Sequence, residues 1–345
     1  MEKETTFLEI WQDYFNILCC PDCIETNSDL IYTDIGDKEI LTCNQCGQEY
    51  MIINSVPILL SQKRNPNTLK TINTNLDFPK PLVKKDVDLS SLGDWKYLSY
   101  QYYSRFQEFK KSLTHFSPQN TVLDIGCAGG SLASIFDHYI GIDISWKLIS
   151  FARSYLDKPF VLADATNLPF KTKSLSHFIS RNMLEHTNND QVIIREASRV
   201  CSANGIFELP CSDGVSFLID PVNTFRIKIG QPPKPFFSYG FGHINMQTET
   251  EWEKRLIKNG FQIKDKRNLG RGIFFKLFSF LEFLFLSYSE NGDIPAKYVN
   301  KSVFKFLHPI YNLIYKIDVK TQKSWSKVFC VQPLGEAVTN ENSVN

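Results

Sequence analysis

The sequence predicts an α/β protein: a doubly wound parallel sheet, preceded by a small cysteine-bearing module and followed by a helical, aromatic-rich segment. Three observations lead to this prediction. Apolar, β-rich runs alternate with amphipathic helical segments between residues 121 and 264. A glycine-rich turn follows the first of these runs, as in sheets that bind ligands at their strand ends. Two C-x-x-C pairs lie between residues 20 and 46.

Composition narrows the class of protein. With 345 residues, 43% of them hydrophobic, the chain can form one large domain plus appendages. A formal net charge of +1 gives no global attraction for nucleic acid. The start Met1-Glu-Lys-Glu has neither the basic residues nor the apolar segment of a secretory signal. We therefore expect a cytoplasmic, reducing setting in which cysteines bind metal rather than form disulfides.

The first module covers residues 1–60 and begins with a helical pattern from Phe7 to Leu18. Two C-x-x-C pairs about twenty residues apart can close a tetrahedral four-thiolate Zn²⁺ site. Cys19 could replace Cys20, although the C-P-x-C pattern favours Cys20. Four thiolates leave no open coordination position, so we expect structural zinc; unligated buried thiols are the alternative. The predicted ligands are Cys20, Cys23, Cys43 and Cys46.

Residues 15–60 resemble the zinc ribbon of the methyltransferase-activator subunit family, which implies a role in folding or in docking a protein partner. Residues 61–92 are polar and interrupted by prolines, which is typical of a linker. The lysines of this linker are better explained as solvated charge than as a nucleic-acid patch. A helix is predicted over residues 94–106, where its aromatic residues either pack on the core or cover a cofactor.

The central motif is Thr121-Val-Leu-Asp-Ile-Gly-Cys-Ala-Gly-Gly130. It predicts a buried strand and a tight turn that opens a helix over Ser131–Phe136, with Asp124 placed to anchor a polar group. A dinucleotide site would require G-x-G-x-x-G, and this pattern fails because Ala128 and Ser131 occupy its third and sixth positions. An ordinary strand-to-helix turn remains an alternative for the motif taken alone.

The D-x-G-x-x-G-G spacing resembles motif I of class I S-adenosylmethionine-dependent methyltransferases, commonly D-x-G-x-G-x-G. Asp124, Gly126 and Gly130 match, and Ala128 replaces the middle glycine, a mild change because alanine adds one methyl group. The resemblance implies a Rossmann-like, seven-stranded methyltransferase sheet over residues 93–270, with S-adenosylmethionine as the cofactor.

Later segments supply further cofactor-binding candidates. A short β-rich run ends at Asp143, about twenty residues after Asp124, where an acid can accept hydrogen bonds from both ribose hydroxyls. Residues 160–170 resemble the x-x-D-A-x-x-L-P-F segment of the ubiquinone/menaquinone-biosynthesis type of methyltransferase domain. This resemblance implies that Asp164 faces the adenine amino group and that the backbone of Ala165 contacts the ring.

Residues 175–186 form the fourth predicted strand and its tip, and their x-x-x-L-E-H pattern matches the same group. Arg181 and Asn182 are expected at the strand tip near the cofactor sulfonium. His186 is a candidate general base because its unperturbed pKa lies near neutrality. The alternative is that the Glu-His pair braces the following helix.

A long, proline-rich insertion between residues 220 and 242 lies where such enzymes build acceptor pockets. Tyr239 and His243 are therefore candidate catalytic residues on the substrate side. Packing within an aromatic loop is the alternative explanation for both.

Residues 271–345 are predicted to form a helical extension. The most apolar stretch, residues 272–288, is about seventeen residues long and is broken by Lys276 and Glu282, so it is too short and too charged for a comfortable transmembrane helix. A second apolar segment, Val303–Ile317, is predicted to be helical on either side of Pro309. The two segments form the apolar region 272–317. Basic residues upstream of it suit peripheral contact with an anionic membrane surface, on the inner face of the membrane, and a lipid-linked acceptor. Helices that pack on the core or on a partner explain the same pattern, and both interpretations stay open.

The predicted function is methyl transfer from S-adenosylmethionine to a small-molecule or lipid-linked (isoprenoid) acceptor. One alternative is an RNA methyltransferase, similar to rRNA guanine methyltransferases that also carry N-terminal cysteine zinc ligands. The near-zero net charge and the apolar C-terminal segment disfavour nucleic acid without excluding it. A catalytically silent scaffold whose ribbon docks a partner is the other alternative.

Overall fold

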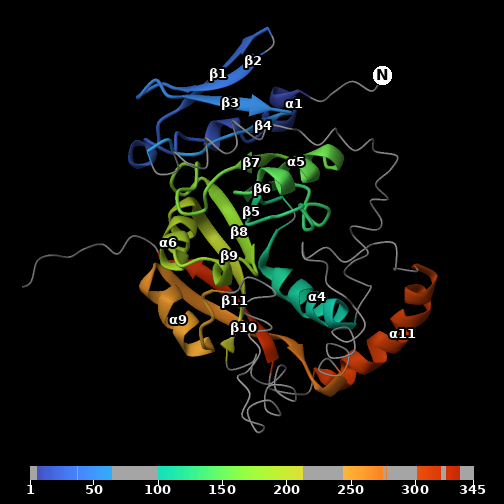
Figure 1. The fold of residues 1–345 in the computed structure, drawn as a ribbon. Coiled ribbons are helices and arrows are strands. Elements are labelled where there is room, and N and C mark those ends of the chain that lie inside the picture. The colour runs from blue at the N-terminus through green and yellow to red at the C-terminus, as the bar shows by residue number, and fades with distance from the viewer. Residues whose placement is uncertain are drawn as a thin grey trace, which may run out of the picture.

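The computed structural model describes residues 6–36, 38–63, 100–117, 119–212, 244–274, 277, 301–319 and 324–334. These residues form a seven-stranded sheet flanked by helices, with a four-stranded sheet placed beside one end of it (Figure 1). The predicted α/β class and the seven strands are confirmed.

The large sheet has the strand order β10-β11-β9-β8-β5-β6-β7. Neighbouring strands from β9 to β7 run parallel, whereas β11 is antiparallel to both β9 and β10. The strands β5 and β6 are buried along almost their whole length, as expected of a parallel sheet whose two faces are covered by helices. The strands are β5 (Val122–Ile125), β6 (Tyr139–Asp143), β7 (Phe160–Leu162), β8 (Leu175–Arg181), β9 (Cys201–Pro210), β10 (Phe261–Arg271) and β11 (Ser324–Pro333).

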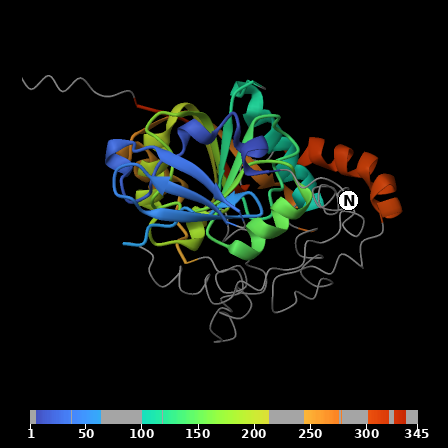
Figure 2. The ribbon, with the colours of Figure 1, turned by 90° about the horizontal axis from the view of Figure 1, so that it is seen from above.

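Two layers of helices make the sheet doubly wound. One apolar cluster joins α4 (Tyr100–Ser112) and α5 (Trp146–Tyr155) to one face of the sheet. The other cluster joins α6 (Asp190–Val200) and α9 (Glu249–Lys258) to the opposite face. Figure 2 shows the two layers on either side of the strands. Short 3₁₀ turns, η1 (Phe15–Ile17), η2 (Ile24–Thr26), η3 (Leu113–His115) and η4 (Leu184–His186), connect these elements.

The N-terminal module contains α1 (Phe7–Trp11) and an antiparallel sheet with the order β1-β2-β3-β4. Its strands are β1 (Leu30–Ile35), β2 (Lys38–Cys43), β3 (Glu49–Ile53) and β4 (Val56–Pro57). The chain after β4 continues along β7: Ile58 bridges Leu162 in parallel, and the Leu59 amide donates to the Leu162 carbonyl at 2.9 Å. The module therefore covers the β7 edge of the large sheet, which would otherwise be left unpaired.

Two sequence-based expectations differ from the structure. Residues 131–135 form successive turns instead of a helix, because left-handed backbone at Ala128 and Gly130 interrupts any helical start. The boundary at residue 270 does not mark the edge of the sheet, since β11 lies between β9 and β10. The segment 271–345 is therefore more than a helical extension: it supplies a strand of the core sheet.

The helix predicted around Pro309 is α11 (Lys301–Asp318), and it packs on α4. The Tyr315 hydroxyl donates to the buried carboxylate of Glu108 and accepts from Lys111 Nζ at 2.8 Å. The face of α11 that points away from α4 exposes Ile310, Leu313 and Ile317. Among the described residues, no helix is both long and apolar enough to cross a bilayer.

Candidate functional site

Four parallel strands bring the predicted cofactor residues to one edge of the sheet. Asp124 lies near the end of β5, Asp143 ends β6, Asp164 follows β7, and Asn182 follows β8. Main-chain hydrogen bonds tie these ends together: the Ala163 amide donates to the Asp143 carbonyl at 3.1 Å. These four residues therefore lie along one edge of the sheet, at the carboxyl ends of its strands, where doubly wound sheets bind ligands.

The turn after β5 lies against its neighbours on both sides. The amides of Gly126 and Cys127 donate to the Ile142 carbonyl at 3.0 and 2.9 Å. Gly126 has φ of +77°, and a Cβ there would lie 2.6 Å from Met183 Cγ. Only glycine meets both demands without strain, so the motif glycine is required by the fold of the turn.

Ala128 departs from the expectation of a mild substitution. Its φ of +47° is left-handed, a conformation that costs a non-glycine residue about 1–2 kcal/mol. Part of this cost is offset because the Ala128 amide donates to Asp143 Oδ2 at 2.9 Å. Strained backbone of this kind is typical of ligand-binding turns.

Asp143 accepts two backbone hydrogen bonds through its half-buried carboxylate. Oδ2 accepts from the Ala128 amide and Oδ1 from the Ser145 amide, both at 2.9 Å. Each carboxylate oxygen has a second lone-pair direction, so the group can still accept hydrogen bonds from two hydroxyls. Asp143 therefore fixes the turn after β5 and keeps acceptor capacity for a ligand that carries hydroxyl groups.

Asp124 lies beneath the turn rather than at its surface. Its side chain is buried and accepts a hydrogen bond from the Tyr139 hydroxyl at 2.8 Å. Burial raises the pKa of Asp124 to about 7, against the lowering effects of the Tyr139 hydrogen bond and of Arg181. These contacts suit a residue that supports the turn.

The turn after β7 is closed by Asp164. Its Oδ1 accepts from the Thr166 amide and hydroxyl, both at 2.8 Å, and its carbonyl accepts from the Asn167 amide at 2.9 Å. Ala165 packs against the apolar core. The Asn167 side chain is buried and donates from Nδ2 to the Pro21 carbonyl at 2.7 Å, so the N-terminal module holds this turn directly.

A buried charge cluster at the tip of β8 was not predicted from the sequence. The Glu208 carboxylate on β9 binds Arg181 on β8 and Arg105 on α4. Burial alone would raise the pKa of Glu208, but the two guanidinium groups outweigh it and lower the pKa to about 2. Arg105 Nη2 also donates to Asn182 Oδ1 at 3.0 Å, and the Arg181 guanidinium lies 4.2 Å from the Phe109 ring centroid. The cluster holds α4 across the strand ends.

His186 ends η4 with its side chain 41% exposed, and its Nε2 lies 3.9 Å from Glu185 Oε1. Burial raises the pKa of Glu185 to about 8. The Glu185 carbonyl accepts from the amides of Ile244 and Asn245 at 2.9 and 3.0 Å, which brings the chain after the insertion to η4. Tyr239 and His243 lie outside the described residues.

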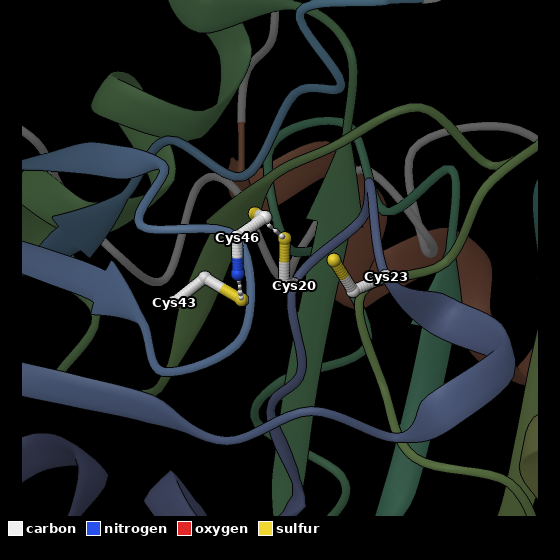
Figure 3. Close-up of side chains that lie close together, drawn as sticks. All are labelled: Cys20, Cys23, Cys43 and Cys46. Atoms are coloured by element: carbon white, nitrogen blue, oxygen red, sulfur yellow. Dashed lines mark hydrogen bonds between the residues drawn. The ribbon is translucent and has the colours of Figure 1, made fainter.

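The four predicted zinc ligands form one sulfur cluster (Figure 3). Their Sγ atoms all lie within 4.8 Å of one another, and those of Cys20 and Cys46 are 3.8 Å apart. A tetrahedral site with Zn–S bonds of about 2.3 Å has edges of about 3.8 Å, so the cluster fits zinc. The amides of Gln45 and Cys46 point at Cys43 Sγ, at 3.4 and 3.5 Å, as donors that stabilise a thiolate. Cys19 is not part of the cluster.

A known protein family matches the part of the chain that contains the central strands of the large sheet. Residues 123–209, which contain nearly all of β5 to β9, match the family model of a methyltransferase domain. This part of the chain is therefore similar to a methyltransferase domain.

Two uncharacterized proteins of Methanocaldococcus jannaschii are similar in sequence. MJ1252 is 41% identical over 87 residues, covering 25% of this chain and 34% of that protein. MJ1123 is 32% identical over 108 residues, covering 31% of this chain and 52% of that protein. The chain thus spans about a third and about half of the lengths of these relatives.

This chain is also similar to a chain in a solved structure, the complex between the Haloferax volcanii Trm112 methyltransferase activator and a protein described as a methyltransferase. It is 13% identical, with a TM-score of 0.42, and the match covers 74% of this chain and 98% of that one.

Proposed function

We propose that this protein transfers a methyl group from S-adenosylmethionine to an acceptor by in-line displacement. One observation carries the proposal: within the methyltransferase domain, the glycine-bearing turn after β5 and the acids of the next two strand ends meet at one edge. When bound, the cofactor supplies an activated methyl group; the protein binds and orients it. Asp143 would hold the ribose, and Asp164 and Ala165 the adenine.

The acceptor we propose is a small molecule or a lipid-linked isoprenoid. The similarity of residues 160–170 to the ubiquinone/menaquinone-biosynthesis type supports it. His186 is the candidate base on the described part of the strand-end edge, because its imidazole side chain is 41% exposed there. Tyr239 and His243 remain candidates for the same role.

Isothermal titration of the zinc-loaded protein with S-adenosylmethionine and S-adenosylhomocysteine tests the proposal. Micromolar binding of both is expected, and absence of binding would leave the scaffold interpretation. Methyl transfer from labelled S-adenosylmethionine to lipid extracts, but not to RNA, would support the acceptor class. Salt-dependent transfer to RNA would instead establish the RNA methyltransferase.

We further propose that the four cysteines hold a structural zinc ion. Cys43→Ser should reduce zinc from about one equivalent to near zero and lower the thermal unfolding temperature of the whole chain. The whole chain is affected because one apolar cluster contains residues of both the ribbon and the large sheet. Cys19→Ser is the matched control, a neighbouring buried cysteine outside the cluster. Elemental analysis that finds equal zinc in both variants would contradict the assignment.

Peripheral contact with an anionic membrane is proposed for the outer face of α11. Ile310, Leu313 and Ile317 are exposed along one side of this helix, and Lys316 is exposed beside them. Leu313→Glu combined with Ile317→Glu should reduce flotation with anionic vesicles about tenfold or more, because two apolar side chains lose their burial.

Asn312→Glu adds charge at an exposed polar position of the same helix and serves as the control for this experiment. Truncation is unsuitable because it would remove β11 from the sheet. Failure of the wild-type protein to float, or equal flotation of both variants, would contradict the membrane contact.

A further inference from the structure

The ribbon and the turn that carries Asp164 are joined by main-chain contacts. The Cys19 amide donates to the Pro169 carbonyl at 3.0 Å, and the Lys171 amide donates to the Ile17 carbonyl at 2.9 Å. The segment before the first C-x-x-C pair therefore runs alongside residues 167–171. A change in the position of this segment would be transmitted to the turn.

Asn167 makes contacts both within the turn that carries Asp164 and with the ribbon. Its backbone amide closes the turn on the Asp164 carbonyl at 2.9 Å, and its side-chain Nδ2 donates to the Pro21 carbonyl at 2.7 Å. The residue is only 4% exposed, so water cannot easily replace a lost partner. The contact is thus a buried link between the ribbon and the proposed adenine-binding turn.

Pro21 lies between two members of the sulfur cluster. The Cys23 amide donates to the Cys20 carbonyl at 3.1 Å, which closes a tight turn around Pro21 and Asp22. If Cys20 and Cys23 bind one ion, the carbonyl of Pro21 is held in a fixed direction. Loss of the ion frees the turn, and with it the acceptor of the Asn167 hydrogen bond.

We infer that Asn167 is a positioning residue through which metal binding at the four cysteines strengthens cofactor binding. The metal fixes the Pro21 carbonyl, that carbonyl orients Asn167, and Asn167 holds the Asp164 turn ready to receive the adenine. The inference rests on the proposed function, because it presumes that this turn binds the adenine. Coupling of this kind typically changes affinity by a factor of about 5–150.

The test is a double-mutant type of cycle on the full chain. S-adenosylhomocysteine and 5′-methylthioadenosine are titrated into wild-type and Asn167→Asp protein, each zinc-loaded and chelator-treated. Aspartate has the same shape but no donor for the Pro21 carbonyl when ionised. Zinc removal should weaken ligand binding by the wild-type protein about tenfold. Zinc-loaded Asn167→Asp protein should bind the ligands more weakly than zinc-loaded wild type by a similar factor. Removal of zinc from the variant should then change its affinity little further.

Asp29→Asn is the matched control. It removes an ion pair with Lys171 in the same interface, but the Asp29 side chain is 64% exposed and is not part of the sulfur cluster. The backbone carbonyl of residue 29, which accepts from the Asn44 amide at 3.1 Å, is retained. It should leave both the affinity and the effect of zinc unchanged. Equal zinc dependence in wild-type and Asn167→Asp protein would overturn the role of Asn167, whereas no binding by zinc-loaded wild type would overturn the proposed function as well.

Hydrogen exchange of the wild-type chain provides a readout that needs no variant. Zinc removal should accelerate exchange of the Asn167 amide by a larger factor than exchange of the β8 amides. Uniform loss of protection would mean that zinc holds the entire fold, and unchanged exchange in the turn would mean that the two sites are independent. Either result would overturn the coupling.

Discussion

Glu208→Gln should lower the free energy of unfolding by about 3–5 kcal/mol, because two guanidinium groups lose their buried counter-charge. The carboxylate is fully buried, and the side chains of Arg105 and Arg181 are only 10% and 20% exposed. Glutamine has the same shape, so no cavity contributes to the loss. Urea unfolding followed by circular dichroism measures the difference between variant and wild type.

The matched control is Glu251→Gln, which removes an ion pair with Lys254 on the surface of α9, where the two side chains are 46% and 68% exposed. Exposed pairs contribute about 0–1 kcal/mol, so this variant should be close to wild type. Equal effects of the two substitutions would show that the cluster on β9 contributes no more than a surface pair.

The pH dependence of the Glu208 effect has a definite sign. The folded-state pKa of Glu208 is lowered from 4.5 to about 2, so the unfolded chain binds the proton more readily. The contribution of the carboxylate is therefore fully present above about pH 5 and is lost as the pH falls toward 2. The stability difference between wild type and Glu208→Gln should shrink over that range. A difference that stays constant down to pH 2 would contradict the lowered pKa.

Local patterns predicted the part of the site that lies at strand ends. Asp124, Asp143 and Asp164 each stand at the end of a short apolar run, and parallel strands bring such ends together. A short apolar run and the glycine turn or helix that follows it can be recognised from a few adjacent residues. This local information is sufficient to predict the edge of the sheet at which a ligand would bind.

Contacts between distant segments were not predicted. Arg105 and Glu208 are 103 residues apart in the sequence, and each resembles an ordinary surface residue of a helix or strand in its local pattern. The strand β11 was missed for a similar reason: its place between β9 and β10 depends on pairing with segments more than fifty residues earlier. The short apolar run Val328-Phe-Cys-Val331 was the available signal in the sequence.

The link between Asn167 and Pro21 shows the same limit within the site. Asparagine after Asp164 looks like a turn residue, and the backbone contacts of the turn agree with that interpretation. Its side-chain partner lies 146 residues earlier, in a module that the sequence presents as separate. Only the three-dimensional arrangement shows that the N-terminal module and the strand-end edge of the large sheet share this residue.

Asp143→Ala should weaken binding of S-adenosylmethionine by about tenfold or more, since hydrogen bonds to a charged acceptor contribute about 1.5–3 kcal/mol. Two effects are expected to contribute to this loss of affinity. The ribose would lose its acceptor, and the amides of Ala128 and Ser145 would lose theirs, which removes the contact that offsets the left-handed backbone at Ala128. Titration calorimetry with S-adenosylmethionine and S-adenosylhomocysteine measures the effect.

Asp143→Asn tests whether the lost ribose contact or the lost turn contacts cause the weaker binding, and Asp157→Ala is the control. Asparagine retains one acceptor but turns an NH₂ group toward a donor, so it should bind nearly as weakly as alanine. Asp157 is 59% exposed and pairs with Arg153 of α5 at 3.3 Å, so its replacement should leave affinity unchanged. If Asp143→Ala bound as well as wild type, the ribose assignment would be wrong. If it bound weakly while Asp143→Asn bound normally, the carboxylate would act by fixing the turn, and its charge would be dispensable.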